Sequence, residues 1–454
     1  MKRVKGLMGI MIACVLLVSM FAGCGSSSKT SSSSPGESNT LGTNGEASKT
    51  TKLEMWTFVG LHNQLFADSA KKWNDEHPDQ QINLKATTYP YTDMHNKLKV
   101  ALQSGVGAPD ICDVEIGQFP NFLKGTPQLV VLDDIIAQDK DKFVQSRLDI
   151  YSKNGKLYGI PTHVGATVAF YNKEIFNEAG VDYTKIKTWD DFRAAGKIIK
   201  ERTGKWMNYI AQTASWDFML MTGQQDSGIF DKDGNVILDN ETNIKTLQLL
   251  HDMIYIDKIS TVSPGGQVDT EEGFGAVNKG TVASVIMPFW YTSRFLANMP
   301  DLKGKIVVQA PPVFADGKYD SVGLGGTGTV ITNQCKNIDL AKKFLFYAKG
   351  TQDANMNIWT TLGFDPPRWD VWDRITQNIG DNKFTQYFAN GKDTFNALIP
   401  IKDKIISPVS VELNPTAYDL LSTQVLYKVL KQNSTTPEAA LKAAADELRK
   451  NASK

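Results

Sequence analysis

A regular alternation of strand-like and helix-like segments in the first third of the chain restricts the fold most. Residues 51–58 (TKLEMWTF) and 81–87 have the alternating apolar pattern of β-strands, and 110–115 is a third such run. Between them, residues 62–74 and 94–103 carry apolar side chains at helical spacing. This order predicts an α/β fold with a parallel sheet and helices on its faces. In such sheets a ligand binds at the carboxyl ends of the strands.

A second unit of the same kind begins after the segment LYGIP. Residues 166–171 have the pattern of a strand, and 173–179 that of a short helix, which Gly180 should end in a left-handed conformation. Thr188 precedes another helix, because its hydroxyl can accept the amide hydrogen three residues further on. Further helices are predicted over residues 243–256, 338–348 (ended by Gly350) and 437–450.

The first residues have the composition of an export signal. Three basic residues precede an uncharged apolar run, residues 6–21. This run is shorter than the about 20 residues that span a membrane, so residues 1–23 are predicted to be a cleaved signal peptide. The run ends in Phe-Ala-Gly-Cys, which resembles the lipobox of bacterial lipoproteins, and Cys24 is the expected lipidation site. The alternative is a chance cysteine after an ordinary signal peptide.

The residues that follow the export signal should not fold. Residues 24–50 are rich in serine, glycine and threonine and show no apolar periodicity, which predicts a flexible tether between membrane and folded body. Beyond the signal and the lipidated position, two cysteines remain, Cys112 and Cys335. Two cysteines form neither a disulfide framework nor a metal-binding cluster, so buried free thiols are expected, with a single bridge as the alternative.

The composition is that of an ordinary globular protein, with 41% hydrophobic and 22% charged residues. This excludes wholesale disorder and a polytopic membrane protein. The chain has 49 basic and 49 acidic residues. The predicted signal peptide contains three basic and no acidic residues, so its loss would make the remaining chain mildly acidic. A nucleic-acid-binding protein normally has a basic excess, so no nucleic-acid partner is expected.

Sequence motifs for catalysis or metal binding are missing. The five histidines form no HExxH pair, and the chain has neither a P-loop nor a GxSxG nucleophile elbow. Residues 323–328 (GLGGTG) fit GxGxxG but lead into a strand-like run, whereas a dinucleotide-binding fingerprint opens a helix. They are predicted to form a glycine-rich turn where backbones approach closely. Residues 231–235 (DKDGN) lack EF-hand spacing and predict a hairpin turn. No cofactor, metal or catalytic residue is expected, although glycosidase-type carboxylates leave no motif.

Aromatic residues stand beside polar ones in several predicted loops, at 216–218 (WDF), 288–291 (PFWY) and 364–370 (FDPPRWD). Sugars present apolar C–H faces and a rim of hydroxyls, so stacked rings with carboxylate or amide acceptors suit them. Most tryptophans of a globular protein pack in its core. Trp290 is the best candidate for a sugar contact, because it follows an apolar strand where a loop should leave the sheet.

Five segments, spread in order over most of the chain, carry a resemblance to a known family. They are residues 56–60 (WTFVG), 104–111 (SGVGAPDI), 156–180, 187–192 (KTWDDF) and 283–291 (ASVIMPFWY). From Leu53 onward the chain resembles the family 1 extracellular solute-binding proteins, the sugar-capturing lipoproteins of ABC importers. Residues 89–95 (YPYTDMH), 151–159 (YSKNGKLYG), 321–330 (SVGLGGTGTV) and 362–372 (LGFDPPRWDVW) are most similar to members that bind arabinose or arabino-oligosaccharides in Gram-positive bacteria.

The resemblance implies a two-lobed, periplasmic-binding-protein-like α/β fold with the ligand cleft between the lobes. Lobe 1 would comprise residues 51–160 and 310–362, and lobe 2 would comprise residues 161–309 and 363–454. Plausible hinges at Gly-Ile-Pro-Thr near residue 160 and Ala-Pro-Pro near residue 310 agree with these boundaries.

The expected ligand contacts come partly from the resemblance and partly from chemistry. Trp290 matches the stacking aromatic of the family's second lobe, and Gly325-Gly326-Thr327 matches the turn where the chain crosses the cleft. The loop after Pro-Asp-Ile supplies polar contacts in the family. His62 and His163 lie at turns that are expected to face the cleft. Trp216 has no firm counterpart in the family and is proposed on its chemistry alone. The complete set is His62, Asp113, Glu115, Gln118, His163, Trp216, Trp290, Tyr291, Gly325, Gly326, Thr327, Arg368 and Trp369.

The resemblance implies a receptor and not an enzyme. Such a protein binds an oligosaccharide or a monosaccharide, closes its lobes and delivers the sugar to the transmembrane subunits of an ABC permease. It would act as a monomer outside the cytoplasm, held by the acyl chains of Cys24 at the outer face of the cytoplasmic membrane. Two alternatives of other classes are a surface-anchored carbohydrate-active enzyme and a sugar-sensing receptor module.

Overall fold

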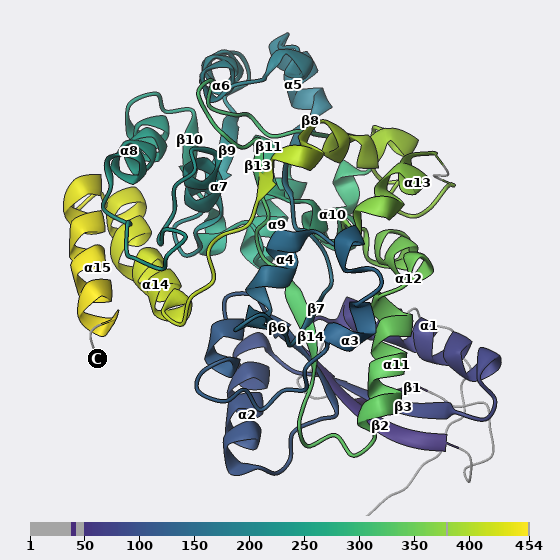
Figure 1. Cartoon of the computed structure of the whole chain (residues 1–454). Helices are drawn as coiled ribbons and strands as arrows, with labels where there is room; N and C mark the ends of the chain where they lie inside the picture. The colour runs from purple at the N-terminus through teal and green to yellow at the C-terminus, as the bar shows by residue number, and fades with distance from the viewer. Residues whose placement is uncertain (1–37, 42–49, 378–379, 453–454) are drawn as a thin grey trace, which may run out of the picture. The chain divides into compact units, whose positions relative to one another are not determined.

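A strand that the sequence did not predict precedes the body of the chain. The computed structural model describes residues 38–41, 50–377 and 380–452, which belong to one structural unit (Figure 1). The predicted signal peptide and Cys24 lie outside these residues. Within the predicted tether, β1 (Ser38–Leu41) pairs antiparallel with β3 (Gln81–Thr88). An edge strand can pair through its backbone alone, so the missing apolar pattern did not reveal it.

The first sheet contains the predicted strand–helix–strand–helix–strand unit. Its six strands run in the order β1, β3, β2 (Thr50–Thr57), β4 (Ile111–Glu115), β14 (Thr327–Ile331) and β7 (Ile160–Pro161). As predicted, β2 is parallel to β3 and β4. The sheet is nevertheless mixed, because β14 returns from far along the chain and lies antiparallel to β4 and β7.

Helices α1 and α11 lie side by side against this sheet and close the core of the first lobe (Figure 1). Leu53 and Ile111 from the strands meet Phe66 and Phe344 from these two helices, and all four are fully or almost fully buried. Each such side chain contributes roughly 1.5–3 kcal/mol when it leaves water. The helices of this lobe are α1 (Gly60–Glu76), α2 (Tyr91–Ser104), α3 (Asp133–Ile136), α4 (Gln145–Ile150) and α11 (Ile338–Lys349).

The second sheet has five strands and defines the second lobe. Their order is β10 (Ser260–Val262), β9 (Trp206–Ile210), β11 (Val282–Pro288), β8 (Thr167–Asn172) and β12 (Ile306–Gln309). β9 is parallel to both neighbours, whereas β8 is antiparallel to both of its own. Every residue of β8 and β11 is buried, which is why these strands lack the alternating pattern. Two short pairs are β13 (Ser321–Val322) with β15 (Ile405–Ile406), and β5 (Ser152–Lys153) with β6 (Lys156–Leu157).

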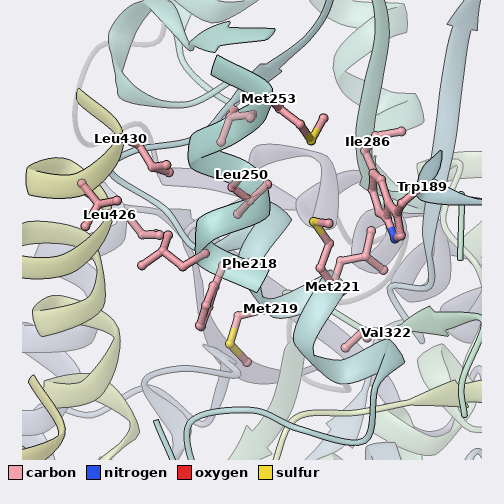
Figure 2. Packing of buried hydrophobic residues seen from close by; sticks show 14 of the residues in the cluster. Trp189, Phe218, Met219, Met221, Leu250, Met253, Ile286, Val322, Leu426 and Leu430 are labelled. Carbon is pink, nitrogen blue, oxygen red and sulfur yellow. The ribbon is translucent and has the colours of Figure 1, made fainter. Parts of the chain in front are cut away.

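The C-terminal helices complete one core of the second lobe. Figure 2 shows Phe218 of α7, Leu250 of α8 and Leu426 of a π-helical segment, Leu421–Lys431, gathered in one cluster. The remaining helices are α5 (Lys173–Ala179), α6 (Trp189–Thr203), α7 (Trp216–Gln224), α8 (Glu241–Tyr255), α9 (Glu271–Asn278), α10 (Thr292–Asn298), α12 (Gln352–Asn357), α13 (Trp372–Gln377), α14 (Asn414–Leu420) and α15 (Pro437–Ala452).

The helix ends predicted at Thr188, Gly180 and Gly350 are confirmed. The Thr188 hydroxyl accepts from the amide of Asp191 at 3.1 Å, and the Asp191 carboxylate accepts from the amide of Thr188 at 2.9 Å. Gly180 ends α5 with φ of 64°. Gly350 also ends its helix, α11, but with φ of −92°, so its backbone is not in the left-handed conformation. A Cβ there would lie 2.1 Å from the ring of Phe346, so close packing requires the glycine.

Segments that pass between the two sheets lie beside one another. The amide of Thr162 donates to the carbonyl of Thr327 at 2.9 Å, and the amide of Val164 donates to the carbonyl of Asp365 at 2.9 Å. The lobe boundaries given above stay a prediction. Cys112 and Cys335 are buried and unbonded, as expected.

Candidate functional site

A cavity of about 470 Å³ opens where the connecting segments and both sheets meet. Eight of the thirteen expected contacts line it: His62, Glu115, His163, Trp216, Trp290, Gly325, Gly326 and Thr327. The other lining residues are Phe58, Val59, Tyr91, Gln267, Asp269, Arg294 and Phe364. Both lobes therefore contribute to the cavity.

The first-lobe wall is built from the carboxyl ends of parallel strands, as the strand order predicts. Phe58 and His62 follow the end of β2, and Glu115 is the last residue of β4. His62 belongs to the first turn of α1, so the helix and the strand together fix the position of its ring.

Two tryptophans form the second-lobe wall. Trp290 directly follows β11 in a short helical turn, and its indole N–H donates to the carbonyl of Leu324 at 3.1 Å. The ring of Trp216 meets it edge-on at 5.8 Å, and the Trp216 N–H donates to Gln267 at 2.8 Å. The guanidinium of Arg294 lies 5.5 Å from the centre of the Trp290 ring. Both indole N–H groups are therefore hydrogen-bonded within the protein. A ligand can contact only the faces and the carbon edges of the two rings.

The glycine-rich turn permits the close approach that the sequence predicts. Gly325 and Gly326 have φ of 65° and 125°, conformations that other residues adopt only with strain. A Cβ on Gly325 would lie 3.1 Å from the Trp290 indole nitrogen, and one on Gly326 would lie 2.3 Å from the Arg147 guanidinium. The turn continues into β14 and not into a helix, which confirms that it is no dinucleotide-binding fingerprint.

Glu115 is the acidic group of the first-lobe wall. Its Oε2 accepts a hydrogen bond from the Tyr91 hydroxyl at 2.9 Å and from the amide of Gly117 at 2.7 Å. Burial raises the pKa of Glu115 to about 7, although both hydrogen bonds act in the opposite direction. The carboxyl group therefore changes charge near neutral pH.

Asp113 lies behind the cavity wall and not in it. Its side chain is fully buried, and its Oδ2 accepts from Nδ1 of His62 at 2.8 Å and from the hydroxyl of Thr57 at 2.9 Å. Burial by itself would raise the pKa of Asp113, but its interactions with His62 and Lys349 and the hydrogen bond from Thr329 outweigh it and lower the pKa to about 2. Asp113 therefore remains ionised and orients His62.

His163 is the most unusual polar residue of the cavity. It is 4% exposed, and neither ring nitrogen has a hydrogen-bond partner among the described residues. Burial, reinforced by the charge of Arg147, lowers the pKa of His163 well below its ordinary value, so the ring is neutral. A buried imidazole without partners is costly, and a ligand hydroxyl in the cavity would satisfy it.

A second cavity of about 260 Å³ adjoins the first. The two share Tyr91, Glu115, Trp216 and Gly325. Gln118, another expected contact, lines only this second space. The site is therefore longer than a single cavity.

Besides Asp113, three expected contacts lie outside both cavities. Tyr291 is fully buried, and its hydroxyl donates to the carbonyl of Val268 at 2.8 Å. The buried guanidinium of Arg368 pairs with Asp370 at 2.8 Å and with Asp139 at 3.2 Å. Trp369 packs edge-on against Trp372 at 5.0 Å. Residues 365–370 therefore have a structural role. In the segment 364–370, the ring of Phe364 lines the main cavity and that of Trp369 does not.

Sequence reasoning missed Gln267, Asp269 and Arg294, which add polar groups to the second-lobe wall. The guanidinium of Arg294 donates to Asp269 at 2.8 Å, so these charges neutralise each other. The two residues lie on separate segments, and no motif joins them. The proximity of Arg294 to Trp290 in sequence was the one available signal.

The described part of the chain holds no group of three or more histidine, cysteine, aspartate or glutamate side chains placed to bind a metal ion. Among its helices, none is long and apolar enough to cross a membrane.

Comparison with known proteins identifies the family to which this chain belongs. Residues 61–355 match the bacterial extracellular solute-binding protein family. The chain belongs to that family. Two similar proteins are named arabinooligosaccharide-binding proteins. The one from Halalkalibacterium halodurans is 48% identical over 88% of this chain and 89% of its own length. The one from Bacillus subtilis is 46% identical over 97% of this chain and 98% of its own length.

The fold of this solute-binding protein is also that of solved relatives. The GacH receptor of Streptomyces glaucescens, solved unliganded and with acarbose, superposes with a TM-score of 0.72 and 20% identity. The match covers 88% of this chain and 97% of the receptor. The two-lobed α/β architecture is therefore confirmed. The family binds solutes and is not a family of enzymes.

Proposed function

We propose that this solute-binding protein captures arabino-oligosaccharides outside the cytoplasm and delivers them to the transmembrane subunits of an ABC importer. The observation that carries the proposal is the identity of 48% and 46% with two proteins named for arabinooligosaccharide binding, each over most of both chains. Identity at this level, extending over both lobes, favours a shared ligand class.

The chemistry of the cavity supports a sugar. Trp216, Trp290 and Phe364 offer apolar ring surface for C–H faces, and Glu115 and His163 offer acceptors for hydroxyl groups. The Asp269–Arg294 pair is internally neutralised, so the described residues that line the cavity include no unpaired lysine or arginine that would select an anionic ligand. We therefore expect a neutral, polyhydroxylated ligand.

The extent of the site supports an oligosaccharide over a monosaccharide. The cavities of about 470 and about 260 Å³ share Tyr91, Glu115, Trp216 and Gly325 as lining residues. A linear chain of sugars would occupy both adjoining spaces, whereas a single pentose would leave one of them to water. Gln118 would then contact the units in the second space.

Ligand contacts from both lobes would link binding to lobe closure. A ligand shifts such an equilibrium only by its difference in affinity for the open and closed forms. Glu115 of the first lobe and Trp290 of the second line the same cavity, so a ligand there would contact both lobes. The closed, loaded form would be what the permease recognises, and the receptor itself is proposed to act as a monomer.

The proposed location includes a lipid anchor. Cleavage after residue 23 and acylation of Cys24 would attach the body to the outer face of the cytoplasmic membrane. Metabolic labelling with a radioactive fatty acid tests this proposal. We expect label on the full-length protein and none on the Cys24→Ala variant, and equal labelling of both would contradict it.

Calorimetric titration of residues 36–454 with arabinose, arabinotriose and maltotriose tests the ligand. We expect stoichiometric binding that is tightest for arabinotriose, with the sugar recovered intact. Preference for maltotriose would overturn the arabinose assignment and leave the receptor role, whereas breakdown of the sugar would overturn that role. Loss of arabino-oligosaccharide uptake when the gene is deleted would separate transport from sensing.

A further inference from the structure

A buried chain of hydrogen bonds leads away from the cavity wall at His62. Nδ1 of His62 donates to Oδ2 of Asp113 at 2.8 Å, and the hydroxyl of Thr329 donates to Oδ1 at 2.6 Å. A carboxylate is an acceptor only, so both bonds require the hydrogen to lie on the partner. The bond to Asp113 therefore demands a proton on Nδ1.

A buried lysine lies at the far end of this chain. The ammonium of Lys349, which is 0% exposed, donates to the hydroxyls of Thr329 and Thr162 at 2.5 and 2.6 Å and to the carbonyl of Ile160 at 3.0 Å. All three of its hydrogens are thus used. Among the described residues no carboxylate contacts this ammonium directly, and Thr329 bridges it to Asp113.

Lys349 and Asp113 together form a neutral pair. A buried aspartate without a cation nearby would draw a proton onto His62, because an isolated charge in the protein interior is costly. With Lys349 in place the carboxylate is already compensated, and His62 need not be charged. A neutral imidazole that carries its proton on Nδ1 has a lone pair on Nε2.

The second ring nitrogen of His62 is the one available to a ligand. Nε2 has no hydrogen-bond partner among the described residues, and His62 lines the main cavity. We propose that Asp113 and Lys349 are positioning residues that hold His62 in its neutral Nδ1–H tautomer, so that Nε2 accepts a hydrogen from a ligand hydroxyl. The tautomer stands independently of the ligand, and the hydroxyl contact rests on the proposed function.

Other titratable and charged groups face the same cavity: Glu115 and Tyr91 from the first lobe, His163 from the connecting segment, and the Asp269–Arg294 pair from the second lobe. Among the described residues, none of these is hydrogen-bonded to His62, whereas Asp113 is. The bonded partner decides which nitrogen holds the proton.

Nitrogen-15 spectroscopy of residues 36–454 with labelled histidine tests the tautomer directly. The His62 signals are assigned by their loss in the His62→Gln variant. We expect the wild-type protein at neutral pH to show a protonated Nδ1 and an unprotonated Nε2, and the Nε2 signal to shift when arabinotriose binds. A protonated Nε2 in the wild type would overturn the proposal.

A pair of lysine variants separates the role of Lys349 from general damage to α11. Lys349→Met should place a proton on both nitrogens of His62 and weaken arabinotriose binding about tenfold or more. Lys342→Met removes a lysine of the same helix that pairs with Asp134 at 2.9 Å on the surface, and it should change neither readout. An unchanged His62 tautomer in folded Lys349→Met would remove Lys349 from the proposal.

Two controls keep the outcomes distinct. If Lys349→Met does not fold, Asp113→Asn provides the test, because its amide can donate to Nδ1 and should move the proton to Nε2. Failure of arabinotriose to bind while the Nδ1–H tautomer is observed would contradict the proposed function only. Binding without any shift of the Nε2 signal would contradict the ligand contact proposed here.

Discussion

Arg147 and Trp290 hold one loop through hydrogen bonds to three successive carbonyl groups. The buried guanidinium of Arg147, on α4 of the first lobe, donates to the carbonyls of Gly323 and Gly325 at 3.2 and 2.7 Å. The indole of Trp290, in the second lobe, donates to the intervening carbonyl of Leu324 at 3.1 Å. The position of the main aromatic wall is therefore tied to the first lobe through this loop.

Gly326→Ala should destabilise the folded chain. Gly326 has φ of 125°, and a Cβ would lie 2.3 Å from the Arg147 guanidinium, so the variant must strain its backbone and displace a buried charge. We expect a loss of about 2 kcal/mol or more in urea unfolding of residues 36–454. Gly304→Ala is the matched control, because Gly304 has φ of 75° but open space around a Cβ, and it should lose about 1 kcal/mol. Equal losses would show that the contact with Arg147 does not matter.

Trp290→Ala should weaken arabinotriose binding about tenfold or more, which corresponds to one lost aromatic contact. Trp290 is only 7% exposed and packs in a core cluster, so the variant should also lose stability, and titration must be done well below its unfolding temperature. Trp369→Ala is the control, because it removes an equally large ring that lies outside both cavities. The affinity of this variant for arabinotriose should equal that of the wild type. An unchanged affinity for Trp290→Ala would remove Trp290 from the site.

The parts of the site that the sequence predicted are those set by local rules. His62 and Glu115 were found because the carboxyl ends of adjacent parallel strands meet at one edge of a sheet. Trp290 was found because an apolar strand ends just before it. The close approach at Gly326 followed from glycine itself.

The parts of the site that sequence reasoning misplaced or missed depend on contacts between distant segments. Tyr291 adjoins Trp290, yet a tight helical turn sends its side chain into the core, and adjacency in sequence does not show this. Arg368 stands in a promising aromatic segment, but its charge is taken up by Asp139, which the chain places beside it only after folding. Lys349 ends an amphipathic helix, where a lysine is usually exposed, and the buried Asp113 explains its position.

Asp365→Asn should flatten part of the dependence of stability on pH. Burial raises the pKa of Asp365 to about 7, even though its carboxylate accepts from the amides of Gly165 and Ala166. Between about pH 4 and 7 the folded chain therefore holds a proton that the unfolded chain releases, so this group's contribution to stability is lost as pH rises, by at most about 1.4 kcal/mol per pH unit.

Urea unfolding across this pH range would measure the effect as the difference between variant and wild type. Asparagine is neutral at every pH and keeps one acceptor, so Asp365→Asn should remove the contribution. Asp353→Asn, which replaces an exposed carboxylate paired with Arg374, should keep the wild-type slope. Identical slopes for Asp365→Asn and the wild type would show that Asp365 ionises normally.

Sugar affinity should rise with pH through the titration of Glu115. Burial raises the pKa of Glu115 to about 7, so the side chain that lines both cavities is mostly protonated at about pH 5.5 and mostly ionised at about pH 8. An ionised carboxylate accepts hydroxyl hydrogens about twice as strongly as a neutral group. We expect arabinotriose to bind up to about tenfold more tightly at the higher pH, measured by calorimetry. Glu115→Gln should bind weakly with little change over this range, whereas Asp365→Asn should keep the wild-type increase. A wild-type affinity that falls as pH rises would show that Glu115 meets the ligand as a hydrogen-bond donor.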